Sequence, residues 1–91
     1  MQDEIIDALM ARAVHADAAR THPLVGWIVM RDQPDCPDEI IARLVTDTPT
    51  PYILLGHTLA EVRIQLPPGL APSERQPSDP AGVVEVWLAQ S

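Results

Sequence analysis

The sequence contains no lysine and only one cysteine, Cys36. A single cysteine excludes an internal disulfide and any zinc site built from several thiolates. The six basic residues are all arginines that stand singly along the chain, against thirteen acids, so the formal net charge is −7. A protein that binds nucleic acid needs a basic surface to neutralise phosphates. Direct contact with DNA, RNA or an anionic membrane is therefore disfavoured. The acidity favours a basic protein partner or serves solubility alone.

Aromatic residues and long apolar runs are also scarce. Only Trp27, Tyr52 and Trp87 are aromatic, while 46% of the 91 residues are hydrophobic, so the core has to be built mainly from Ile, Leu, Val and Ala. Residues 1–91 form one domain near the lower size limit for folding alone, which keeps a homodimer open. The apolar run at 25–30 is too short to cross a bilayer, and the first residues lack the basic region of a secretory signal. We expect a cytoplasmic protein.

No pattern of catalytic residues is apparent. The chain has no serine in a nucleophile-elbow context and no glycine-rich loop that could hold phosphate. His15, His22 and His57 fall on separate predicted elements without the spacing of metal ligands. Cys36 lies among carboxylates, which disfavour the reactive thiolate. We therefore expect no catalytic residue, no metal and no cofactor, and a protein that is not an enzyme.

Two loop segments offer an alternative function. Residues 32–39 contain four carboxylates and Cys36, which could hold a divalent cation. Their spacing differs from that of a calcium-binding loop, and Pro34 and Pro37 stiffen the backbone, so a solvated hairpin tip is favoured. Residues 67–82 contain five prolines. A loop of this length either packs along the surface or has a binding role.

The hydrophobic periodicity predicts two helices. Apolar residues at helical spacing indicate a helix over residues 3–19, with an acidic first turn that suits the positive end of the helix dipole. Pro23 ends this region, because the residue before a proline avoids the helical conformation. Thr58 and Glu61 have the spacing of a capping box, which begins a short second helix that Pro67 stops.

The remaining apolar runs predict strands. Residues rich in Val, Ile, Leu and Trp indicate four of them, at 25–30, 39–46, 52–55 and 83–88. The resulting order, α-β-β-β-α-β, predicts an α+β fold with a four-stranded, mainly antiparallel sheet and both helices on one face. A meander followed by a crossover predicts the strand order 3-2-1-4.

The alternation along the strands predicts a binding surface. In the last predicted strand, Trp87 lies on the face opposite Val84, Val86 and Leu88. If these three aliphatic residues face the helices, Trp87 and Trp27 lie on the uncovered side of the sheet, where clustered aromatic residues favour an interface. Alternatively, one or both tryptophans belong to the core. Ile64 falls off the apolar stripe of the second helix and could also contact a partner. The predicted interface residues are Val25, Trp27, Val29, Glu85, Trp87 and Ile64.

One segment resembles a known family. Residues 49–66 are similar to the strand-to-helix junction of HicB-type antitoxins, which carries a Gly-x-Thr-x-x-Glu segment matched by Gly56, Thr58 and Glu61. The β-β-β-α-β order expected from Val25 onward is also similar. The resemblance implies a small protein that binds and neutralises a basic RNA-cleaving partner. The Pro-Gly-Cys segment usual before that junction is missing, and residues 67–91 show no pattern of a DNA-binding module.

From the sequence, the leading hypothesis is a non-enzymatic module that binds a protein through the open face of its sheet. The partner is a basic protein or a second copy of the chain, as in a homodimer. The alternative is a regulatory domain that binds a small ligand or a metal through residues 32–39 or 67–82.

Overall fold

The structure is a computed structural model that describes residues 3–31, 38–73 and 82–89. The Cys36 thiol and most of the acidic segment 32–39 therefore lie outside the described residues, as does much of the proline-rich segment 67–82. The described elements, in chain order, are β1 (Glu4–Ile5), α1 (Ala8–Thr21), β2 (Gly26–Met30), β3 (Ile40–Val45), β4 (Pro49–Gly56), α2 (Leu59–Gln65), β5 (Leu70–Ser73) and β6 (Val83–Ala89).

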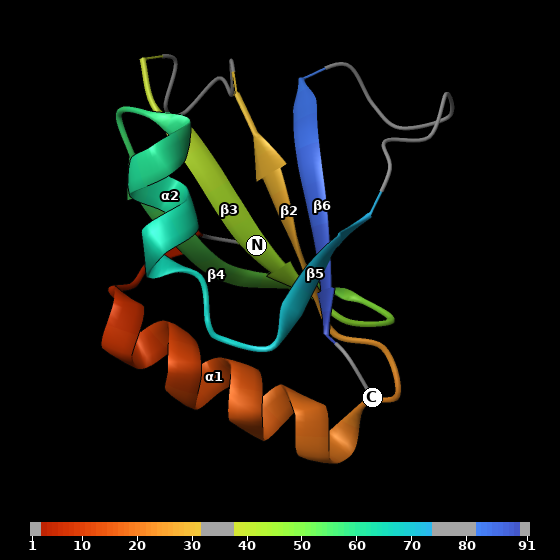
Figure 1. Cartoon of the computed structure of the whole chain (residues 1–91). Coiled ribbons are helices and arrows are strands. Elements are labelled where there is room, and N and C mark those ends of the chain that lie inside the picture. Colours follow the sequence, from red (N-terminus) through yellow and green to blue (C-terminus); the bar gives the residue numbers. More distant parts are fainter. Residues whose placement is uncertain (1–2, 32–37, 74–81, 90–91) are drawn as a thin grey trace.

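The fold is α+β, with two described helices packed on a mixed sheet whose six described strands have the order β1-β4-β3-β2-β6-β5 (Figure 1). Its central four strands, β4-β3-β2-β6, are antiparallel and follow the order expected from the sequence. The prediction of a four-stranded sheet is wrong, because β1 extends one edge in parallel with β4 and β5 extends the other in antiparallel with β6.

The predicted helix over residues 3–19 begins too early. Asp7 is the N-cap, and its carboxylate accepts a hydrogen bond from the Met10 N–H at 2.8 Å. Such a cap satisfies an N–H group that has no partner within the helix. The preceding residues Glu4 and Ile5 pair with β4 instead, and the Ile6 N–H donates to the Ile53 carbonyl at 2.9 Å. An available sheet edge thus overrides the helical spacing of these residues.

The predicted loop at 67–82 contains strand β5. Pro72 lies opposite Trp87 on this edge strand, a position that tolerates proline because no further strand is described outside it. Gly69, with φ of 85°, makes the turn that leads into the strand. The chain therefore uses part of this segment to extend the sheet.

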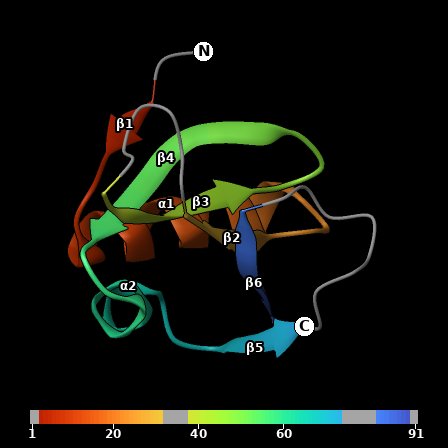
Figure 2. The same ribbon diagram turned by 90° about the horizontal axis from the view of Figure 1, so that it is seen from above.

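Both helices cover the same face of the sheet, as expected. Ala11 of α1 and Val62 of α2 are fully buried in one core cluster with Trp27, Leu44 and Leu54. The sheet curves around these helices, which is clearest when it is seen from above (Figure 2). The curvature gives the sheet one face packed against helices and one face that neither described helix covers.

Candidate protein-interaction surface

Three of the predicted interface residues lie in the core. Trp27 and Val29 have no exposed surface and Val25 is buried. The register explains this, because Trp27 is directly opposite Leu44 on one side and Trp87 on the other, all on the helix-covered face. The placement of Val25, Trp27 and Val29 on an open face is therefore wrong, and these side chains are unavailable to a partner of the folded protein.

Trp87 and Glu85 share that covered side of the sheet and are partly buried. The Trp87 indole N–H donates to a Glu85 carboxylate oxygen at 3.0 Å. Arg63 of α2 binds both oxygens of the same carboxylate, one of them through its Nε at 3.1 Å. Hydrogen bonding to Arg63 lowers the pKa of Glu85, with a smaller contribution from Trp87. These groups join α2 to β6, and the expectation that they line an open face is also wrong.

The opposite face of the sheet carries Val86 and Leu88, which were expected to meet the helices, whereas Val84 packs against the core cluster as expected. Cross-strand partners point to the same side, and the register groups Val86 with Ile28, and Leu88 with Gly26. The apolar side chains on this helix-free face are Ile28, Met30, Ile41, Val45, Ile53, Leu55, Val86 and Leu88. Ile41 and Ile53 are buried and the other six are half-buried.

Arg43 is the charged side chain within this face, and it is held on two sides. It pairs with the Asp3 carboxylate at 2.9 Å and donates to the Thr50 carbonyl at 2.9 Å. The hydrogen bond from Arg43 lowers the pKa of Asp3. Because Asp3 immediately precedes β1, this ion pair ties the added edge strand to the centre of the sheet.

Three of the five exposed large apolar residues of the described chain gather at its N-terminal end. Leu9 is 78% exposed, Ile5 63% and Met10 50%, and all three line one hollow together with Glu4 and Asp7. We call Ile5, Leu9 and Met10 the N-terminal apolar patch. The helical spacing of these residues over 3–19 does not predict their exposure, which depends on whether another segment covers them.

The patch adjoins the helix-free face of the sheet. Ile5 is the register partner of Ile53, so its side chain lies on that face at the β1 edge. Ile64, the remaining predicted interface residue, is 81% exposed on α2. Its position off the apolar stripe agrees with the sequence, and its contact with a partner stays a prediction.

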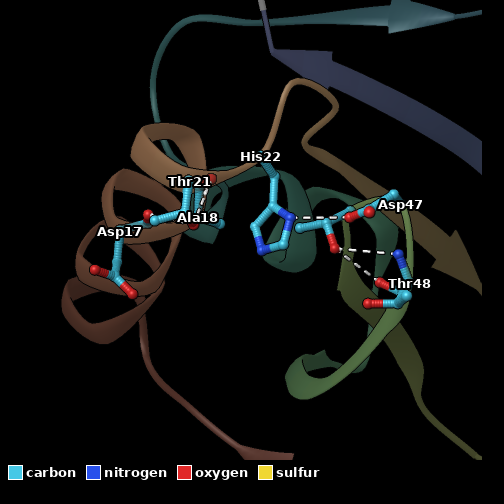
Figure 3. Close-up of polar contacts among 7 residues, drawn as sticks. Asp17, Ala18, Thr21, His22, Asp47 and Thr48 are labelled. Atoms are coloured by element: carbon cyan, nitrogen blue, oxygen red, sulfur yellow. Dashed lines mark hydrogen bonds and ion pairs between the residues drawn. The ribbon is translucent and has the colours of Figure 1, made fainter.

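A second hollow lies between the C-terminal half of α1 and strands β3 and β4, with His22, Asp17 and Tyr52 in its lining. Figure 3 shows the His22 ring pointing from the end of α1 toward Asp47 in the β3–β4 turn, with a 2.9 Å contact from Nδ1 to the carboxylate. The Thr21 hydroxyl is bound to the carbonyls of Asp17 and Ala18. This arrangement caps the helix and ties it to the turn.

The described part of the chain contains no group of three or more His, Cys, Asp or Glu side chains arranged to hold a metal ion. Residues 32–37 and 74–81, on which the predicted ligand or cation site depends, lie outside the described residues. Within the described ranges, no helix has the length and apolar character needed to cross a membrane.

The chain matches no protein-family model, and comparison with curated proteins and with solved structures gives no match. The similarity of residues 49–66 to HicB-type antitoxins remains a resemblance in sequence. The N-cap of this segment is formed, because the Thr58 hydroxyl accepts from the Glu61 N–H at 3.2 Å. The Glu61 carboxylate accepts from the His57 N–H at 2.7 Å, one residue before the Thr58 N–H that a capping box uses.

Proposed function

We propose that this protein is a non-enzymatic interaction module that binds a protein partner through the N-terminal apolar patch. The observation that supports this function is the shared hollow of Ile5, Leu9 and Met10, three of the most exposed large apolar side chains of the described chain. Burying one such side chain contributes about 1.5–3 kcal/mol. Clustered apolar residues on a polar surface are typical of protein-binding sites.

The charge of the protein favours a basic partner. Glu4 and Asp7 line the same hollow as the patch, and the whole chain has a net charge of −7. Three of the arginines are paired with carboxylates of the protein itself, in Arg20–Asp17, Arg43–Asp3 and Arg63–Glu85. Arg12, one helical turn beyond Leu9, is the basic group nearest along the helix. A partner segment with apolar residues flanked by Lys or Arg would complement this surface, and long-range attraction would speed its association.

A second copy of the chain is the alternative partner. A homodimer would bury the same patch, but two molecules of charge −7 repel each other. We therefore favour a different, basic protein, and we expect the complex in the cytoplasm.

The proposal is tested by comparing proteins that bind to the wild type and to two variants. The double variant Leu9→Ser/Met10→Ser removes the apolar side chains of the patch. Leu24→Ser is the matched control, because Leu24 is 50% exposed and lies beyond the other end of α1. The 14 residues of this helix span roughly 20 Å.

Quantitative mass spectrometry of the bound proteins should find a basic protein retained by the wild type and by Leu24→Ser but lost with the double variant. The purified pair should then bind with the same dependence on Leu9 and Met10. Sedimentation velocity of the three proteins separates this result from self-association. Equal binding by all three, with no change in oligomeric state, would contradict the proposal.

A further inference from the structure

Helix α1 is attached to the core through a histidine. The indole N–H of Trp27 donates to Nδ1 of His15 at 3.1 Å. The ring planes are 19° apart and the ring centroids 6.4 Å apart. The indole N–H and the lone pair of Nδ1 both lie in the planes of their rings, so this hydrogen bond joins the two rings edge to edge rather than face to face. Trp27 has no exposed surface, so water has no access to replace His15 as the acceptor.

This geometry fixes the protonation state of His15. Because Nδ1 accepts a hydrogen bond, its proton is absent and the neutral ring carries its hydrogen on Nε2. A protonated imidazole has two N–H donors and no acceptor. Protonation would therefore turn two donors toward each other and leave the buried Trp27 N–H without a partner. The imidazolium would also lie at the positive edge of the indole, where no cation–π attraction offsets this loss.

In the described part of the chain, no carboxylate forms an ion pair with His15. On α1, Asp17 is bound to Arg20, and Arg12 is another cation. On the elements packed beside α1, the ionisable groups are Tyr52 of β4, Glu61 and Arg63 of α2, and Glu85 of β6. The Glu85 carboxylate already accepts hydrogen bonds from Arg63 and Trp87, and the Glu61 carboxylate accepts one from the backbone N–H of His57. Consistent with this, burial alone lowers the pKa of His15.

We propose that His15 and Trp27 form a proton-sensitive latch, in which protonation of His15 in mild acid loosens α1 from the sheet and opens Trp27 to water. The other contacts of α1 with the core, through Ala11, Val14 and Ala18, are apolar and do not respond to pH. The contact of His22 with Asp47 ties the end of α1 to the β3–β4 turn and is separate from this core cluster. Leu9 and Met10 lie on the same helix, so the latch would also regulate the N-terminal apolar patch. This last step alone rests on the proposed function.

The latch is tested on the isolated protein by NMR between pH 8 and pH 5. The upper part of this range brackets 6.5, the ordinary pKa of histidine. The lower limit of pH 5 lies above 4.5, the ordinary pKa of a glutamate, and the pKa of Glu85 is lower still. Glu85 therefore stays charged throughout the titration. We expect the Trp27 indole N–H signal to shift with the titration of the His15 ring. Its protection against exchange, relative to the intrinsic rate at each pH, should fall at least tenfold, while the protection of the Trp87 indole N–H stays unchanged.

The variant His15→Gln separates the latch from a general effect of acid, because the amide oxygen can accept from Trp27 and does not titrate. It should abolish the transition, whereas His22→Gln and His57→Gln should retain it. Persistence of the transition in His15→Gln would overturn the proposal. Protonation of His15 in the wild type with no change in the protection of the Trp27 N–H would also overturn it. That measurement needs only the wild type, so it remains decisive if the variant fails to fold. These measurements use the isolated protein and need no partner. A negative result in the binding experiment therefore contradicts the proposed function without contradicting the latch.

Discussion

Arg63 and Glu85 join helix α2 to strand β6 although they lie 22 positions apart in the sequence. The Arg63 guanidinium binds both carboxylate oxygens, a geometry that makes such pairs stronger than single contacts. The Trp87 N–H donates to the same carboxylate. One carboxylate thus holds a helix and an aromatic ring of the sheet in place.

The substitution Arg63→Ala should raise the pKa of Glu85, because the hydrogen bond from Arg63 is the largest cause of its lowered value. In the wild type this pair contributes stability that is present above pH 4.5, the ordinary value, and is lost as the pH falls through the lower pKa of the folded protein. Thermal unfolding between pH 3 and 7 should show a smaller loss in acid for the variant. Arg20→Ala, which removes an exposed pair, should leave the acid dependence as in the wild type.

Leucines at two positions should differ sharply in their contribution to the fold. Leu54 is fully buried between β3 and the helices, so Leu54→Ala should lower the free energy of unfolding by about 2–5 kcal/mol. Leu9→Ala should change it by less than about 0.5 kcal/mol, because Leu9 is exposed. Urea denaturation measures both. A large loss for Leu9→Ala would mean that the N-terminal apolar patch stabilises the fold rather than standing free for a partner.

Gly56 is required where β4 passes into α2. A Cβ atom there would lie 2.9 Å from a Val62 methyl group and 3.2 Å from the Val62 backbone nitrogen. Gly56→Ala should therefore cost about 1–3 kcal/mol, because α2 has to move. The double variant with Val62→Ala should be less destabilised than the sum of the two single changes, because the methyl contact is shared. Strict additivity in urea denaturation would show that the contact with the Val62 methyl group is not the cause.

His15→Gln should remove one component of the pH dependence of stability. The lowered pKa of His15 means that its contribution is complete above pH 6.5 and is lost as the pH falls through the folded-state value. One proton limits this slope to about 1.4 kcal/mol per pH unit. Denaturation midpoints from pH 8 to 5 should be flatter for His15→Gln than for His22→Gln. Equal slopes would assign the pH dependence to other groups.

Asp3→Asn should loosen strand β1. Removing the charge weakens the pair with Arg43 that ties this two-residue strand to the sheet. Hydrogen exchange of the Ile6 N–H, which donates to the Ile53 carbonyl, should become faster, while exchange of the Ile28 N–H in the sheet centre should not. Unchanged exchange at Ile6 would show that backbone pairing alone holds β1.

Local chemistry in the sequence was sufficient to predict several elements. The capping box at Thr58 and Glu61 marked the start of α2, and Pro23 marked the end of α1. The runs of β-branched and other apolar residues marked the four central strands, and short loops between three of them set their antiparallel order. These features depend on residues close together in the chain, so the sequence displays them directly.

The position of the binding surface was not accessible in this way. In β2, Trp27 and Val29 on one side alternate with Ile28 and Met30 on the other, and both sides are apolar. Alternation then shows which residues share a face, but it does not show which face meets the helices. The pairing of Trp27 with His15 and with Leu44 decides that question, through partners 12 and 17 positions away in sequence.

By itself the sequence determined the composition of the core, the acidic surface and the locally encoded helices and strands, because these depend on residue type and short spacing. Tertiary structure alone decided that residues 4–5 and 70–73 extend the sheet, that the tryptophans lie beneath the helices, and that Leu9 and Met10 remain exposed. Each of these outcomes depends on whether a segment distant in sequence supplies a strand edge for hydrogen bonding or an apolar surface for burial. The spacing of residues along the chain does not show which distant segments will meet.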